Sequence, residues 1–135
     1  MTDQPSSVAY LDSSALFKLV VEEEESRALR NALLSWPRRI SSRIAVLEVL
    51  RGVRRRDETA EPLARSVLGS VALLTIGDRV LMTAARLDPP GLRSLDAIHL
   101  ATALRLASDL TAFVSYDVRQ LEAAATLGLP VTSPL

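Results

Sequence analysis

The pattern that decides the fold is Val8-Ala9-Tyr10-Leu11-Asp12-Ser13-Ser14-Ala15-Leu16-Phe17, residues 8–17. Its first four residues form a short apolar run that ends at Asp12, which predicts a buried strand. Helical character follows from Ser13 to Val21. A strand that ends at a carboxylate and passes at once into a helix is typical of sheets in which strands and helices alternate.

The rest of the chain repeats this alternation. Further strands are predicted at 40–42, 71–76, 112–115 and 130–132, and further helices at 22–35, 44–55, 59–68, 79–87, 95–107 and 118–127. The acidic run 22–25 suits a first helical turn, and Asp78 and Ser94 are expected to cap the helices that follow them. Breaks are expected at Trp36-Pro37, Pro89-Pro90-Gly91 and Gly128. The pattern predicts a short, mainly parallel sheet covered by helices on both faces.

Composition is that of a globular protein, with 135 residues of which 48% are hydrophobic and 24% charged. We expect one domain over residues 1–135, able to bury roughly two-thirds of its unfolded surface. No apolar run approaches the roughly 20 residues that span a bilayer, and residues 1–10 lack a secretory signal. We therefore expect a cytoplasmic protein without membrane contact. With no cysteine and one histidine, thiol chemistry, disulfides and multi-histidine zinc sites are excluded.

Charge is unevenly distributed along a chain whose formal net charge is zero. Residues 27–56 hold nine arginines and one acid, Glu48, which is a net charge of +8, and the remainder carries −8. A basic segment beside a separate acidic pool indicates an anionic partner on one face. A solvated arginine-rich surface is an equal alternative on charge alone.

Four carboxylates form the candidate site. Asp12 and Asp117 follow predicted strands, Asp96 lies in the first turn of a predicted helix, and Glu48 interrupts an otherwise apolar helical stretch. Taken singly, each has a structural explanation, since the three aspartates could stabilise helix N-termini and Glu48 could pair with Arg51 or another arginine.

Taken together, the four acids favour a function. Carboxylates about 5 Å apart repel by roughly 3 kcal/mol per pair at an effective dielectric constant near 20. Such a cluster must bind protons, arginines or a cation, and oxygen ligands suit Mg²⁺ or Mn²⁺. A bound Mg²⁺ can activate water and neutralise a phosphodiester, while the basic segment would hold a polynucleotide.

Four segments resemble the motifs of the PIN-domain ribonucleases. They are Tyr10-Leu11-Asp12-Ser13-Ser14-Ala15-Leu16-Phe17-Lys18-Leu19, Glu48 in its apolar helix, Ser94-Leu95-Asp96-Ala97-Ile98-His99-Leu100-Ala101-Thr102-Ala103, and Phe113-Val114-Ser115-Tyr116-Asp117-Val118-Arg119-Gln120-Leu121 with Gly128-Leu129-Pro130-Val131 after it. They occur in order over nearly the whole chain, whose compact length is similar to that of VapC-type toxins.

The resemblance implies a three-layer α/β/α PIN-like fold and cleavage of RNA that depends on Mg²⁺ or Mn²⁺. It implies that Asp12, Asp96 and Asp117 hold the metal and that Glu48 completes the catalytic acidic pocket. It also implies a homodimer and inhibition by a cognate VapB-type antitoxin. For the dimer, the apolar faces of the helices near 25–35 and 59–70 offer a second argument, because one small sheet need not cover them.

Other polar residues are given lesser roles. Ser14 and Ser115 fall where the family often has a small hydroxyl residue and are expected to orient the carboxylates. Arg51, Arg54 and Arg55 lie about one helical turn beyond Glu48, where RNA phosphate, an antitoxin or solvent could face them. His99 is expected to be structural rather than a general base. Ser13 and Ser14 have no histidine nearby in sequence, which argues against a hydrolase triad.

The leading hypothesis is a metal-dependent endoribonuclease, the toxin of a VapBC-type toxin–antitoxin system. Because activated water attacks phosphorus in line, the products should carry 5′-phosphate and 3′-hydroxyl ends. Two alternatives are a catalytically silent binding module and a small α/β phosphatase or phosphotransfer domain. A receiver-like phosphotransfer domain would need an acidic pair near the first strand and a lysine after a late strand, whereas serines follow Asp12 and the only lysine is Lys18.

Overall fold

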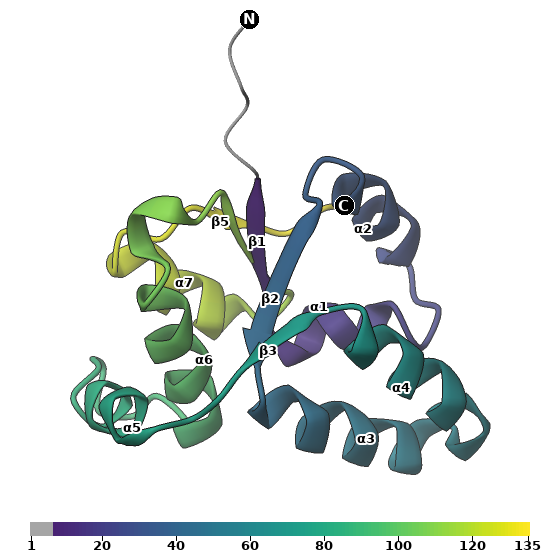
Figure 1. The fold of residues 1–135 in the computed structure, drawn as a ribbon, viewed down its shortest axis with the longest axis horizontal. Coiled ribbons are helices and arrows are strands. Elements are labelled where there is room, and N and C mark those ends of the chain that lie inside the picture. Colours follow the sequence, from purple (N-terminus) through teal and green to yellow (C-terminus); the bar gives the residue numbers. More distant parts are fainter. Residues whose placement is uncertain (1–6) are drawn as a thin grey trace, which may run out of the picture.

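A computed structural model describes residues 7–135, which form a five-stranded parallel sheet with helices on either side (Figure 1). The strands are β1 (Val8–Leu11), β2 (Arg38–Ser42), β3 (Ala72–Leu74), β4 (Ala112–Val114) and β5 (Val131–Thr132), in the spatial order β3-β2-β1-β4-β5. The direction of winding reverses between β1 and β4. Open parallel sheets bind ligands beyond the carboxyl ends of the strands at such a reversal.

The helices divide between the two faces of the sheet. They are α1 (Ser13–Lys18), α2 (Ser26–Leu33), α3 (Ile44–Arg56), α4 (Glu61–Gly69), α5 (Asp78–Ala85), α6 (Ser94–Leu104) and α7 (Val118–Thr126), with single 3₁₀ turns η1 (Glu58–Ala60) and η2 (Ala107–Asp109). In Figure 1, α1 to α4 lie on one side of the sheet and α5 to α7 on the other. The three-layer α/β/α architecture predicted from the sequence is confirmed.

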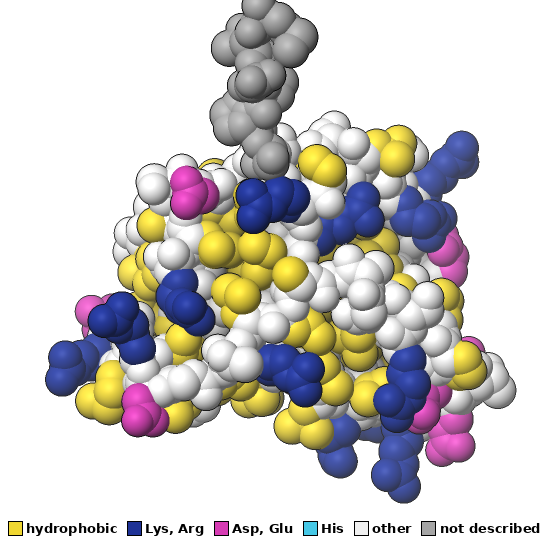
Figure 2. All heavy atoms as spheres, viewed as in Figure 1, with side chains coloured by type: hydrophobic (Ala, Val, Ile, Leu, Met, Phe, Trp, Pro, Cys, Tyr) yellow, Lys and Arg dark blue, Asp and Glu magenta, His cyan; other side chains and the backbone are white. Residues whose placement is uncertain are grey.

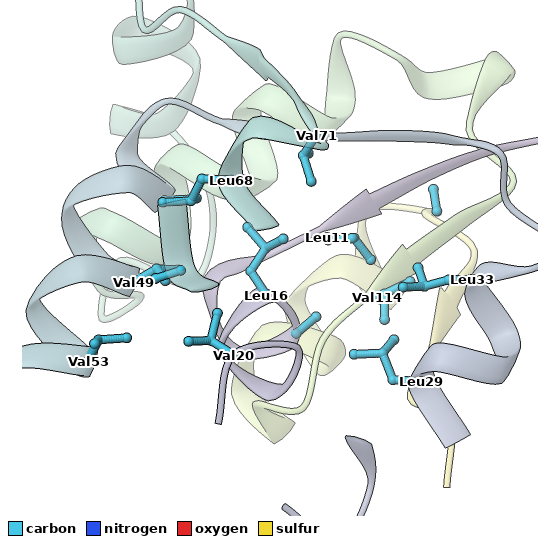
Figure 3. Packing of buried hydrophobic residues seen from close by; sticks show 14 of the residues in the cluster. Leu11, Leu16, Val20, Leu29, Leu33, Val49, Val53, Leu68, Val71 and Val114 are labelled. Carbon is cyan, nitrogen blue, oxygen red and sulfur yellow. The ribbon is translucent and has the colours of Figure 1, made fainter. Parts of the chain in front are cut away.

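Alternate residues of the central strands build two separate cores. On β1, Ala9 and Leu11 pack with α1 to α4, whereas Val8 and Tyr10 pack with α6 and α7. This period of two follows from the pleat of a strand. Because both faces are covered, all four residues of β1 are buried. Figure 3 shows the larger core, with Leu16 of α1 inside it.

Helix ends near the reversal are fixed by side chains and by glycine. The Asp12 carboxylate accepts the backbone N–H of Ala15 at the start of α1, and Asp117 caps α7. At the other end of α7, Gly128 has φ +83°, a left-handed conformation that glycine adopts without strain. Its N–H donates to Ala125 O and that of Leu129 donates to Ala124 O, which is the Schellman pattern.

Three predicted helix starts are wrong. The acidic run 22–25 does not begin α2, which starts at Ser26, because its side chains form ion pairs instead: Glu23 and Glu25 with Lys18, and Glu22 with Arg30. Gly77 and Arg93, both with extended backbones, are the N-caps of α5 and α6. Asp78 and Ser94 are therefore the first helical residues rather than caps.

The remaining boundaries differ from the predicted ones by a few residues, and β3 is shorter than predicted. Within residues 7–135, no helix has both the length and the hydropathy that crossing a bilayer requires. Residues 1–6 lie outside the described residues. The prediction that residues 1–10 lack a secretory signal falls mostly on them.

Truncation of Leu16 should destabilise the fold strongly. Leu16 is fully buried, so Leu16→Ala leaves a cavity beneath the sheet and should lower the free energy of unfolding by about 3 kcal/mol. Val118→Ala is the control, because Val118 is 67% exposed, and it should change that free energy by less than about 0.5 kcal/mol. Urea unfolding measures both, and equal effects would contradict the packing described.

Candidate active site

Asp12 lies at the carboxyl end of β1, where its backbone N–H donates to Val114 O of β4. Its side chain is buried, and both carboxylate oxygens accept hydrogen bonds. Oδ1 accepts from Ser14 Oγ at 2.6 Å and from Ala15 N at 3.0 Å, and Oδ2 accepts from Ser115 Oγ at 2.5 Å. A carboxylate offers about four acceptor positions. The three donors therefore fix its orientation and leave capacity for a further partner.

Burial raises the pKa of Asp12 above its ordinary value, although the charge of His99 and the three hydrogen bonds act in the opposite direction. A buried carboxylate is costly to ionise unless positive charge or donors compensate it. Asp12 is thus an acid that a nearby cation would stabilise in its ionised form.

Asp117 lies beyond the end of β4, next to Asp12 across the reversal. Its Oδ1 accepts the N–H groups of Arg119 at 2.9 Å and Gln120 at 3.3 Å at the start of α7. Its own N–H donates to Ser115 Oγ at 3.1 Å. Since that same hydroxyl donates to Asp12, Ser115 links the two acids.

Residues 132–134, at and just after β5, form hydrogen bonds with Ser115 and Tyr116. The N–H of Ser115 donates to Thr132 O at 3.3 Å, and Ser133 Oγ donates to Ser115 O at 2.6 Å. The hydroxyl of Tyr116 donates to Pro134 O at 2.7 Å. The peptide that follows β4 is therefore tied to the strand at the edge of the sheet.

Asp96 lies in the first turn of α6, and its side chain is partly buried. Gln120 of α7 donates to its backbone carbonyl at 3.3 Å. Burial raises the pKa of Asp96, and the negative charges of Asp117 and Asp12 raise it further. The charges of two aspartates that lie far from it in sequence therefore act on Asp96.

Glu48 reaches the site from α3. Its Oε1 accepts from Ser13 Oγ at 2.5 Å and faces His99 Nε2 at 2.8 Å. Burial opposes ionisation, but these hydrogen bonds and the charge of His99 outweigh it and hold the pKa of Glu48 below its ordinary value. Within residues 7–135 the basic side chain that contacts Glu48 is that of His99, so the alternative of an arginine partner is not observed.

Sequence reasoning missed the contacts of His99. The side chain is 1% exposed, as expected of a structural histidine, yet its Nε2 lies 3.0 Å from Ser13 Oγ, 86 residues away in the chain. The arrangement is not a hydrolase triad, because Nδ1 faces the Tyr10 hydroxyl rather than an acid and Ser13 donates to Glu48. The available signal was spacing: His99 lies one turn after Asp96 on the same helix.

An open groove of about 880 Å³ runs past Glu48, Ser13 and Ser14. Its basic lining residues are Lys18, Arg51, Arg55, Arg56 and Arg93. Arg54 is exposed but does not line the groove, and neither do the three aspartates. Figure 2 shows basic side chains gathered over the lower edge of the molecule, where α3 lies.

The donor set suits a hard divalent cation. The acids offer only oxygen, which Mg²⁺ and Mn²⁺ prefer. Among the described residues, no three acidic or histidine side chains are gathered closely enough to hold an ion by themselves. Mg²⁺ commonly keeps several waters and uses one or two carboxylates, so the residues present fit such an ion without a complete cage.

Similar proteins share both the sequence and the fold. The PIN domain family model matches residues 9–126. Ribonuclease VapC46 of Mycobacterium tuberculosis is 48% identical over 125 residues, which cover 93% of this chain and 96% of that protein. Ribonuclease VapC35 of the same species is 42% identical over 132 residues, with the same coverage of both chains.

Solved structures have the same architecture. A chain of a toxin–antitoxin complex from Klebsiella pneumoniae superposes with a TM-score of 0.73 at 25% identity, covering 94% of this chain and 98% of that chain. Mycobacterium tuberculosis VapC20, a toxin that cleaves the sarcin-ricin loop, gives a TM-score of 0.72 at 15% identity, covering 90% and 95%. With a family match over most of its length, this chain belongs to the PIN-domain family and to its VapC-type branch.

Proposed function

We propose that this protein is a divalent-metal-dependent endoribonuclease and the toxin of a VapBC-type toxin–antitoxin pair. The observation that carries the proposal is the meeting of Asp12 and Asp117 at the reversal of the sheet, where the Ser115 hydroxyl donates to Asp12 and accepts the N–H of Asp117. The charges of both acids also raise the pKa of Asp96. The names of the relatives support RNA as the substrate, since VapC46 and VapC35 are ribonucleases. A silent binding module would have no need of aspartates gathered beyond the carboxyl ends of β1 and β4 and at the start of α6.

Asp12 and Asp96 are the residues that would hold Mg²⁺ or Mn²⁺, and Asp117 would bind the ion directly or through water. When bound, such an ion lowers the pKa of water and neutralises charge on the phosphodiester. Ser14 and Ser115 keep the Asp12 carboxylate in one orientation, and the cap of α7 does the same for Asp117. Among the described residues, the hydrogen bonds of Glu48 end on Oε1, which leaves Oε2 to orient the attacking water.

Arginines of α3 would bind the RNA backbone. Arg51 and Arg55 line the groove that Glu48 also lines, so an RNA strand lying in the groove would have a phosphate beside Glu48. Phosphate contacts of this kind position a nucleic acid without reading its sequence.

An antitoxin partner and a homodimer belong to the same proposal. The similar Klebsiella pneumoniae chain is part of a toxin–antitoxin complex, which supports an antitoxin as partner. Exposed apolar side chains, namely Leu34, Leu63, Leu81 and Met82, offer surface for such contacts.

Asp96→Asn should lower Mg²⁺-dependent cleavage of total cellular RNA by at least about 100-fold, because it removes a charge that the metal requires. The wild type should leave 5′-phosphate and 3′-hydroxyl ends, read by end-specific ligation and sequencing. Asp78→Asn is the matched control, since Asp78 is exposed at the start of α5, and it should cleave normally. Equal cleavage by Asp96→Asn and wild type, or 2′,3′-cyclic phosphate ends, would overturn the assignment.

Ser115→Ala should lower the apparent affinity of the protein for Mg²⁺ and leave its affinity for RNA unchanged. It removes the donor to Asp12 Oδ2 and the acceptor of the Asp117 N–H, so the Mg²⁺ concentration for half-maximal rate should rise about 10- to 100-fold. Ser66→Ala, an exposed serine of α4, serves as control. An unchanged Mg²⁺ requirement in Ser115→Ala would show that the hydroxyl does not support the metal site.

The double variant Arg51→Ala/Arg55→Ala should weaken binding of single-stranded RNA, measured with Asp96→Asn in the background to prevent cleavage. If each arginine contacts one phosphate, the slope of log affinity against log salt should fall by about 0.7 per residue. Arg54→Ala is the control, because Arg54 lies on the same helix but does not line the groove. This substitution should leave the slope unchanged. Equal slopes for all variants would place RNA elsewhere.

A further inference from the structure

A line of buried hydrogen bonds connects the centre of the sheet to Glu48. Tyr10 is fully buried on β1, where its ring stacks on Phe113 with centroids 5.4 Å apart and planes inclined by 2°. Its hydroxyl oxygen lies 2.7 Å from His99 Nδ1, and Nε2 of the same ring lies 2.8 Å from Glu48 Oε1. The imidazole is thus held at both nitrogens.

The direction of these hydrogen bonds follows from the donors available. An ionised carboxylate can only accept, so His99 Nε2 must carry the hydrogen that faces Glu48. The other nitrogen, Nδ1, accepts from the Tyr10 hydroxyl when the ring is neutral and donates to the Tyr10 oxygen when the ring is protonated. Ser13 donates to the same Oε1, so two independent donors point at one oxygen of Glu48.

These hydrogen bonds restrict the conformational freedom of the Glu48 side chain, which is greater than that of the aspartates. A glutamate has one more rotatable bond than an aspartate, and its side chain here is 22% exposed along the groove. His99, with 1% exposure, cannot meet an RNA strand in the groove. Its position is fixed by Tyr10, whose ring also packs edge-on against it at 5.8 Å.

We infer that His99, anchored by Tyr10, is a positioning residue for Glu48: it fixes the carboxylate by Oε1 and so presents Oε2 to the attacking water. The inference rests on the proposed ribonuclease function and adds the residues that set the geometry of its fourth acid. His99 therefore acts through Glu48 and touches neither RNA nor metal.

Two amide variants separate the two nitrogens of the ring. The amide of asparagine lies near the position of Nδ1 and that of glutamine near Nε2. His99→Asn should therefore keep a partner for Tyr10 but lose the donor to Glu48, and kcat should fall about 10- to 100-fold while KM stays within about two-fold. His99→Gln keeps a donor at Glu48 and should recover most of the lost kcat. A wild-type kcat in His99→Asn would overturn the inference.

A double-mutant cycle tests whether the effect passes through Glu48. In a Glu48→Ala background, His99→Asn should cause no further loss of kcat, because the group it positions is gone. Independent, additive losses would contradict the inference. If His99→Asn does not fold, Tyr10→Phe replaces it in the cycle, since it keeps the ring stacked on Phe113 and removes one hydroxyl; its kcat should fall about five-fold, and a wild-type kcat would count against the inference.

The imidazole can also be observed without any activity, because His99 is the only histidine of the chain. In protein labelled with ¹⁵N-histidine, the single ring should show a protonated Nε2 that exchanges slowly with water. Glu48→Ala should shift the Nε2 resonance, and Tyr10→Phe should shift that of Nδ1. A ring protonated at Nδ1 alone, or one insensitive to Glu48→Ala, would overturn the inference.

The two proposals fail in different ways. If wild-type protein does not cleave RNA, or if Asp96→Asn cleaves equally well, the ribonuclease assignment fails whatever the spectra show. If wild type cleaves and Asp96→Asn does not, a normal kcat for His99→Asn rejects only the role given to His99.

Discussion

The hydrogen bonds that hold the buried carboxylate of Asp12 are the interaction on which the site depends. A charged group removed from water needs donors or positive charge around it. Ala15, Ser14 and Ser115 supply three donors from the start of α1 and the end of β4. The same contacts start a helix, join two neighbouring strands and orient a carboxylate, so the fold cannot form in its described geometry without also forming the site.

Much of this arrangement could be predicted from sequence because it is local. The apolar run that ends at Asp12 gave β1 and the position of its acid, and the same pattern around Asp117 gave β4 and the cap of α7. Parallel strands have their carboxyl ends at one edge, which predicted that these acids would meet. Ser14 and Ser115, the two small hydroxyl residues singled out from the sequence, both donate to Asp12.

The parts that could not be predicted depend on contacts between distant segments. The acidic run 22–25 suited a helix start by local rules, but its ion pairs with Lys18 and Arg30 keep it outside α2. Glu23 Oε2 also lies 3.4 Å from Arg56 Nη1. Glu22 and Glu23 therefore neutralise part of the positive charge of residues 27–56. The hydrogen bond between His99 and Glu48 could not be predicted, because the two residues lie 51 positions apart in sequence.

The hold that residues 132–134 have on Ser115 and Tyr116 has a practical consequence for anyone handling the protein. Ser133 and Pro134 secure the peptide that carries the hydroxyl shared by Asp12 and Asp117, whereas Leu135 is 91% exposed. A chemical label attached to the side chain at position 135 would leave these hydrogen bonds intact. Removal of Ser133 and Pro134 would abolish two of these contacts and loosen the peptide whose hydroxyl orients Asp12.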